Sequence, residues 1–442
     1  MNWYVITALL CVYGFFKEFR PVEPFLTPYL QSPLKNFSDE QLNSEIYPYW
    51  TYSYLIALIP TFILTDLLRY KPVIFFEGLT YAATWLLLIW GYSVGQMQLM
   101  QTFYGFATAT EIAYYAYIFA AVDSAHYKKA TSYVKAAVEL GDFFAYGLSQ
   151  LLIHIYPEDY QLLNYISLAS CILIVPLSVC LPWITYKKPL KKDDDIKILE
   201  TANNFGLFEV TSIQIPTSYL DFVKKYFITL WSNFKRIYST TFMWKWSLWW
   251  ALATCGFFQI GNYIQNLWEV MQTGEGEQLN GVVEAINTFL SCLLVVCMQF
   301  VTVRWDIWGE ATLAVVSAID CFLLIVMSQS NIIGLVYAFY ILFTLIYQMM
   351  FTIGMFNIAK RLTTESYGLV FGFNTFIALA LQTALTFAVA DESGLALDIR
   401  PQFVVYGCYY GCIAILFAVM GGYTLCRHFR RNAIRTNSSL VY

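Results

Sequence analysis

Polar side chains recur along one face of a long apolar segment around residue 110. A helix places the residues at i, i+4, i+7 and i+11 of this segment on one side, and they are Tyr104, Thr108, Glu111 and Tyr115. Aromatic faces attract cations, and a carboxylate can neutralise a cation or accept hydrogen bonds. The pattern therefore predicts a pocket for an aromatic, cationic solute. The alternative is a structural glutamate paired with a base such as Lys135.

Motifs for catalysis or cofactor binding do not occur in the sequence. It has no nucleophile elbow, no phosphate-binding loop and no dinucleotide fingerprint, and its three histidines have no metal-ligand spacing. The ten cysteines form no C-x-x-C motif and no disulfide framework. We therefore expect no catalytic residue, no metal and no cofactor.

The composition indicates that the polar face lies in a membrane. Hydrophobic residues make up 58% of the 442 residues and charged residues 13%, whereas a soluble domain is about half apolar and a quarter charged. The net charge is -4, whereas proteins that bind nucleic acids usually carry an excess of positive charge, so no nucleic-acid partner is expected. Continuous apolar runs of about twenty residues predict membrane-spanning helices rather than the strands of an outer-membrane barrel.

Twelve apolar segments form two sets of six, separated by a charged stretch. The segments start near Trp3, Tyr49, Val73, Met97, Ser132 and Leu163, and then near Trp246, Val282, Trp308, Gly334, Gly368 and Phe403. This layout predicts an all-α polytopic protein with the major facilitator fold and twelve transmembrane helices in two six-helix bundles. The expected parts are an N-terminal bundle (1–185), a cytosolic linker (186–245), a C-terminal bundle (246–425) and a cytosolic tail (426–442).

The distribution of lysine and arginine among the loops predicts that both termini and the linker face the cytosol. Asn36 begins an N-glycosylation sequon in the first outer loop, which agrees with this orientation. Asp66 and Arg69 lie in a loop on the cytosolic side. We expect a gating role for this pair, because charge clusters there usually lock the inner gate of this fold.

Ionisable and amide groups in other segments are further candidates for the pocket. An ionisable group in hydrocarbon costs roughly 2.5–3.5 kcal/mol, so it is expected to face a cavity or a partner. Glu23 follows Pro21, which interrupts the first segment, although a solvated helix end is the alternative. For Trp50 the alternative is an interfacial aromatic belt, and for Asn262 it is an interhelical hydrogen bond. Glu284 could face the substrate, carry a proton or be structural.

Several longer strings resemble the reduced folate carrier/thiamine transporter family. They lie at residues 20–29, 43–54, 249–256 and 371–383, and the resemblance runs from about residue 14 to residue 426 except in the linker. Folate carriers of the family have an arginine where this chain has Glu111 and a lysine where it has Gln382. Because a dianion would be repelled by Glu111, the resemblance favours the thiamine branch.

The resemblance implies a plasma-membrane thiamine carrier that works by alternating access, with Glu111 binding the aminopyrimidine edge of thiamine. Aromatic walls and polar contacts would come from Tyr104, Trp50, Trp85, Glu23 and Asn262. Glu284 matches a family glutamate near the cavity, and its role stays open. Gln101, Thr344 and Asp142 depart from the family pattern. The alternative is a carrier of folate or another organic anion, and a monomer in the lipid bilayer is favoured.

Overall fold

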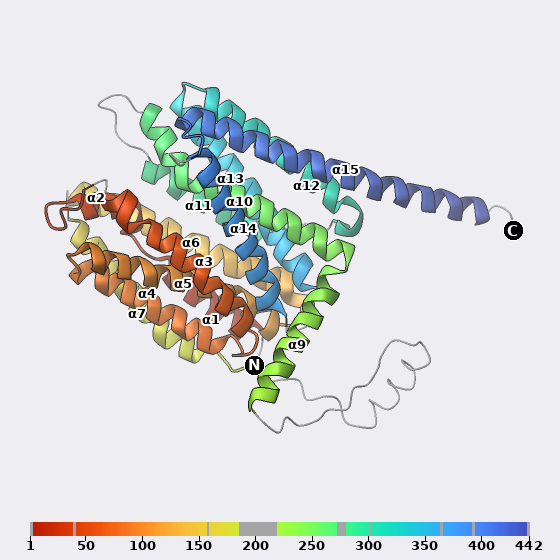
Figure 1. Ribbon diagram of the computed structural model, residues 1–442, viewed down its shortest axis with the longest axis horizontal. Helices are drawn as coiled ribbons and strands as arrows, with labels where there is room; N and C mark the ends of the chain where they lie inside the picture. Colours follow the sequence, from red (N-terminus) through yellow and green to blue (C-terminus); the bar gives the residue numbers. More distant parts are fainter. Residues whose placement is uncertain are drawn as a thin grey trace.

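The structure is a computed structural model that describes residues 3–38, 41–156, 159–184, 219–271, 280–300, 303–362, 366–390 and 394–439. These residues are nearly all helical, and Figure 1 shows two groups of helices side by side. The first half contains α1 (Trp3–Glu18), α2 (Leu26–Gln31), α3 (Pro48–Leu64), α4 (Lys71–Trp90), α5 (Val94–Ala121), α6 (Tyr127–Ile155) and α7 (Tyr160–Cys180). The second half contains α9 (Tyr219–Tyr238), α10 (Thr241–Met271), α11 (Asn280–Cys297), α12 (Trp305–Gln329), α13 (Ile333–Ala359), α14 (Tyr367–Val389) and α15 (Ile399–Ser439).

Helices α1, α3–α7 and α10–α15 follow the predicted spans. Each begins at the predicted residue or at most five residues before it. The additional residues include Tyr127 and Lys128 of α6, which are types that a membrane interface accommodates. Three α-helical stretches were not predicted, namely the short α2, α9 inside the expected linker and the continuation of α15 through the expected tail. The charged part of the linker, residues 185–218, lies outside the described residues.

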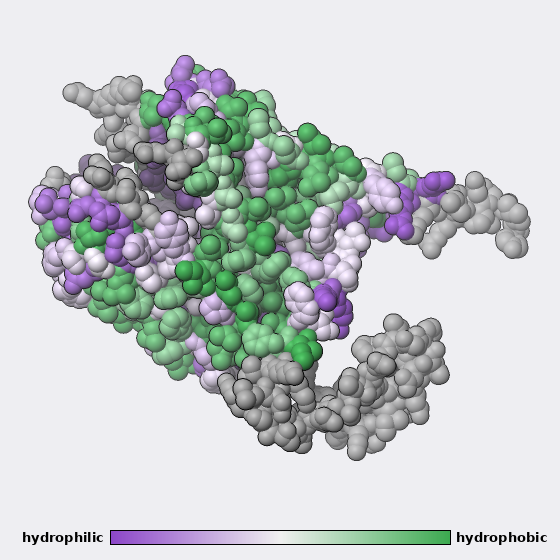
Figure 2. Space-filling model, in the orientation of Figure 1, coloured by the Kyte–Doolittle hydropathy of each residue, from purple (hydrophilic) through white to green (hydrophobic). Residues whose placement is uncertain are grey.

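Seven of the described helices are long and apolar enough to cross a membrane, namely α4, α7, α11, α12, α13, α14 and α15. Helices α1, α5 and α6 are not among the helices that meet this criterion of length and apolar composition. They carry charged side chains such as Lys17, Glu111 and Lys135. Figure 2 shows a mainly hydrophobic outer surface over the bundles, with hydrophilic residues gathered at their ends. The charged groups inside the first half therefore have to be satisfied by one another.

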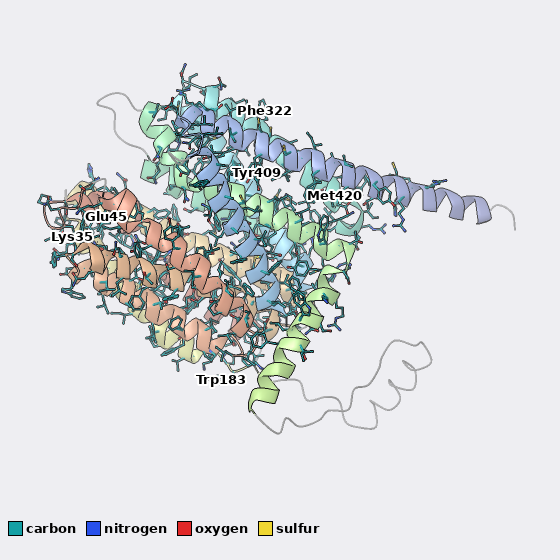
Figure 3. All side chains as sticks on the ribbon, viewed as in Figure 1. Lys35, Glu45, Trp183, Phe322, Tyr409 and Met420 are labelled. Carbon is teal, nitrogen blue, oxygen red and sulfur yellow. The ribbon has the colours of Figure 1, made fainter. Side chains whose placement is uncertain are left out.

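The first half has two distinct ends, which Figure 3 marks with labelled side chains. Lys35 and Glu45 lie at one end, here called the distal end, and Trp183 lies at the other, here called the linker end. The Lys35 ammonium donates to the carbonyls of Ile89 (2.9 Å) and Gly91 (2.5 Å), which fastens the distal loop to the end of α4. Burial lowers the pKa of Lys35 to about 8. The next residue, Asn36, is exposed.

The two halves meet at the linker end through the start of α14. The Asp66 carboxylate accepts hydrogen bonds from the backbone N–H groups of Gly368 (3.1 Å) and Leu369 (3.0 Å), so it caps a helix of the opposite half. The hydroxyls of Tyr127 and Tyr367 lie 2.8 Å apart. Arg69 belongs to the same loop as Asp66 and has a positive φ of 62°. These contacts hold the linker end closed.

A glycine allows the close approach of α3 and α14 in this contact. A Cβ at Gly372 would overlap the Cβ of Phe62, so no larger residue fits unless the helices move apart. The closed linker end therefore depends on one capping carboxylate and one glycine.

We predict that Asp66→Ala and Gly372→Ala each shift the protein towards a conformation with an open linker end. Loss of the cap is expected to cost about 0.5–2 kcal/mol. The measurement is the rate at which a cysteine at Thr375, in the cavity described below, reacts with an impermeant maleimide from the linker side.

Asp66→Asn is the matched control, because its amide oxygen still accepts a hydrogen bond and should give a smaller increase. Protein without the Thr375→Cys change reports labelling of native cysteines. An unchanged labelling rate in both variants would contradict a gate at this contact.

Candidate functional site

A cavity lies between the two halves, and we call it the central cavity. From the first half it is lined by Tyr54, Thr108, Glu111, Ile112, Tyr115 and Lys135. The second half contributes mainly aromatic and hydroxyl side chains, including Trp250, Thr254, Phe257, Tyr347, Phe351 and Phe371. Phe371 also packs against Phe119, with ring centroids 5.6 Å apart, so it separates the cavity from the linker-end contact.

A second cavity lies within the first half, and we call it the side cavity. Its lining comes from the chain after α1 and from α3, α4 and α5, and it includes Glu23, Tyr47, Trp50, Trp85, Gln101 and Tyr104. The Tyr104 hydroxyl donates to Glu23 Oε1 at 3.1 Å. The Tyr104 ring lies 6.1 Å from the Trp50 ring and 6.2 Å from the Trp85 ring. The side cavity thus has three aromatic walls and one carboxylate.

The two cavities adjoin at Trp50. Its indole N–H donates to Thr108 Oγ1 at 3.3 Å, and Trp50 lines the side cavity whereas Thr108 lines the central cavity. This arrangement requires α3 and α5 to lie very close together. Gly105 permits it, because a Cβ there would lie 2.8 Å from the backbone nitrogen of Tyr54.

A buried lysine on α1 holds the carboxylate that was predicted to bind the solute. Lys17 Nζ lies 2.7 Å from Glu111, 3.2 Å from Glu18 and 3.6 Å from Glu77. The Lys17 side chain has no exposed surface, whereas 29% of the Glu111 side chain is exposed, and Glu111 lines the central cavity. The carboxylate that lines the central cavity therefore already has a positive partner in this structure.

A second base of the same region completes this network. Arg20 forms ion pairs with Glu18 and with Glu23 at 3.1 Å, and its guanidinium lies 4.8 Å from the Tyr81 ring and 5.6 Å from the Trp85 ring. Arg20 thus connects the charges near Glu111 with the wall of the side cavity. The network contains two bases, Lys17 and Arg20, and four acids, Glu18, Glu23, Glu77 and Glu111.

The structure corrects the expected alternative partner of Glu111, which was Lys135. The Lys135 ammonium lies instead over the rings of Tyr115 (5.0 Å) and Phe351 (4.8 Å), and Lys17 takes the position beside Glu111. Tyr115 also lies 5.6 Å from Lys17, so its ring stands between the two ammonium groups.

The predicted site residues divide into three groups. Glu23, Trp50, Trp85 and Tyr104 line the side cavity, and Glu111 and Tyr115 line the central cavity. Asn262 and Glu284 line neither cavity. Asn262 is exposed, and Glu284 accepts hydrogen bonds from Tyr340 (2.9 Å) and Asn287 (3.3 Å) within the second half. Glu284 is therefore already satisfied by neighbouring helices.

Sequence reasoning did not identify Lys17, Arg20 or Glu77 as site residues. The signal was present, because Lys17 ends the first apolar segment and Glu77 lies inside the third. A requirement that each ionisable residue in a span has a partner would have identified both.

Comparison with known proteins identifies the family. A sequence model described as Reduced folate carrier matches residues 1–405. The chain belongs to the reduced folate carrier family. The carrier is 43% identical to Folate transporter 1 of Caenorhabditis elegans, over 95% of this chain and 92% of the relative. It is 39% identical to Thiamine transporter 1 of Homo sapiens, over 99% of this chain and 94% of the relative.

Solved structures confirm the predicted fold. The proton:xylose symporter XylE of the major facilitator superfamily matches this carrier with a TM-score of 0.64 at 12% identity, over 93% of this chain and 94% of the other. The human organic anion transporter MFSD10 (TETRAN) matches with a TM-score of 0.62 at 11% identity, over 94% and 100%. The carrier is a multi-pass membrane transporter of the major facilitator fold and not an enzyme.

We predict that Lys17→Met lowers the free energy of unfolding by about 3–5 kcal/mol, because it leaves buried carboxylates without their base. Thermal unfolding of the purified carrier in detergent measures this loss as a lower midpoint. The double variant Lys17→Met/Glu77→Gln should recover part of the stability, since it also removes one of the unpaired acids. A midpoint equal to that of the unsubstituted carrier in Lys17→Met would contradict a structural role for this ion pair.

Proposed function

We propose that the carrier transports thiamine across the plasma membrane by alternating access between the two halves. The observation that carries this proposal is the charge of the two adjoining cavities. Among the described residues that line them, the charged groups are two carboxylates, Glu23 and Glu111, and one ammonium, Lys135. This excess of one negative charge suits a cationic aromatic vitamin better than a dianion.

The aromatic rings support a pose that uses both cavities. Trp50, Trp85 and Tyr104 offer faces for stacking and for cation–π contact with a thiazolium ring, and Glu23 adds a negative charge beside them. Glu111 offers acceptor oxygens to the aminopyrimidine edge from the central cavity.

A folate or another organic anion is the second candidate, because Lys135 faces the central cavity and Lys17 already neutralises Glu111. The names of the relatives are compatible with both substrates, since they include folate and thiamine transporters. The excess of carboxylates in the cavity lining favours the cation.

The proposal includes a membrane orientation with both termini in the cytosol and the linker end facing inwards. The membrane potential would then drive a cation inwards. Asp66 and Arg69 would belong to the inner gate, which is closed in this structure, so the substrate would enter from the distal end. A monomer is sufficient for this mechanism, because both halves of the site come from one chain.

We predict that Glu111→Gln weakens thiamine transport by about 10- to 100-fold, which is the loss expected for one charge-assisted hydrogen bond. Uptake of radiolabelled thiamine in cells, normalised to surface expression, measures the effect. Gln101→Asn, which shortens another side chain of the side-cavity lining without changing charge, is the matched control and should lose less.

Competition on the unsubstituted carrier separates the two candidate substrates. Unlabelled thiamine should inhibit labelled thiamine uptake, and folate at the same concentration should not. Uptake of labelled folate that thiamine fails to inhibit would refute the proposal in favour of the anion carrier.

We also predict that Asn36→Gln removes a glycan and increases gel mobility of the protein from mammalian cells, because Asn36 is exposed at the distal end. Glycosidase treatment should shift the unsubstituted protein to the same position and leave Asn36→Gln unchanged. Equal mobility of both untreated proteins would contradict a glycosylated outer loop.

A further inference from the structure

Under the proposed function, Glu111 has two partners, the Lys17 ammonium and the substrate. It faces the central cavity and at the same time pairs with Lys17 at 2.7 Å through Oε1. An amino-pyrimidine edge that donates to this carboxylate meets a group whose negative charge the ammonium already offsets. Lys17 therefore competes with the substrate for the group that binds it.

Lys17 has a second position within reach. Glu77 Oε1 lies 3.6 Å from Lys17 Nζ, just beyond hydrogen-bond distance, and it is buried without a hydrogen-bond partner among the described residues. The other oxygen of Glu77 accepts from Tyr13 at 3.0 Å, which holds the carboxylate in place. A buried acceptor without a partner is costly, so this oxygen favours the arrival of a donor.

Other contacts of Lys17 allow such a movement without exposing its charge. Glu18 stays 3.2 Å away, and the Tyr114 ring lies 4.8 Å from the ammonium. A shift from Glu111 towards Glu77 thus exchanges one carboxylate for another within a buried cluster. The change needs a small displacement of Nζ and no movement of a helix.

We propose that Lys17 is a tethered counter-cation that occupies Glu111 in the empty carrier and moves to Glu77 when the substrate binds. This inference rests on the proposed function. Lys17 then determines specificity. It sets how strongly Glu111 discriminates between a substrate that donates a hydrogen bond to this carboxylate and a substrate that offers an acceptor there. Glu77 takes part by providing the second position for the ammonium.

The test compares thiamine with oxythiamine, which has oxygen in place of the pyrimidine amino group. The readout is the ratio of the Kd of oxythiamine to the Kd of thiamine for the purified full-length carrier, measured by calorimetry. A merely structural effect changes both Kd values in parallel and leaves the ratio unchanged.

Two variants should move this ratio in opposite directions. Glu77→Gln replaces the charged acceptor of the second position with a neutral amide oxygen, so Lys17 favours Glu111 and the ratio should fall by at least about fivefold. Lys17→Met/Glu77→Gln removes the competitor together with one acid, so Glu111 is free and the ratio should rise by at least about fivefold above that of the unsubstituted carrier.

A ratio that is unchanged or rises in Glu77→Gln would overturn this inference while thiamine binding upholds the proposed function. Glu77→Gln keeps the Lys17–Glu111 pair, so it decides the outcome even where the double variant does not fold. Absence of saturable thiamine binding to the unsubstituted carrier would overturn both the proposed function and the inference.

Discussion

The ion pair between Lys17 and Glu111 is the interaction on which the first half of the carrier depends. A charge inside a membrane protein needs a partner, and here one buried ammonium lies within 3.6 Å of three carboxylates. Arg20 extends this arrangement to Glu18 and Glu23. The helices that carry these groups are therefore held in position by electrostatics as well as by packing, and Glu111, which lines the central cavity, belongs to that structural network.

The aromatic residues of the site have a different role from the charges. Trp50, Trp85 and Tyr104 shape the side cavity, and their faces tolerate a cation without requiring a fixed hydrogen-bond geometry. Glycine at position 105 brings α3 and α5 close enough for Trp50 to reach Thr108, which connects this cavity with the central one. The shape of the cavities thus comes from ring packing and helix proximity, whereas the charged groups of their lining are Glu23, Glu111 and Lys135 among the described residues.

The contact between the halves at the linker end combines directional hydrogen bonds with packing of α14 against α3 and α5. One carboxylate, Asp66, caps α14 of the opposite half, and Tyr127 meets Tyr367. Close packing of α3 and α14 at Phe62 and Gly372 and the ring contact of Phe119 with Phe371 accompany these hydrogen bonds, so a rigid movement of one half has to separate packed side chains as well. The central cavity is bounded by this contact through Phe371, so a separation of the halves at the linker end would open the cavity that Glu111 lines.

The sequence by itself determined the class of protein, the positions of the membrane helices and the polar face that includes Tyr104 and Glu111. These features follow from local composition and helical periodicity, which need no knowledge of neighbouring helices. Only the tertiary structure decided which base pairs with Glu111, since Lys17 and Glu111 are separated by 94 positions and Lys135 was an equally plausible partner. It also decided that Glu23, Trp50 and Trp85 share one cavity whereas Asn262 and Glu284 lie elsewhere. The physical reason is that contacts between helices depend on their rotation and packing, and the sequence of each helix alone does not specify them.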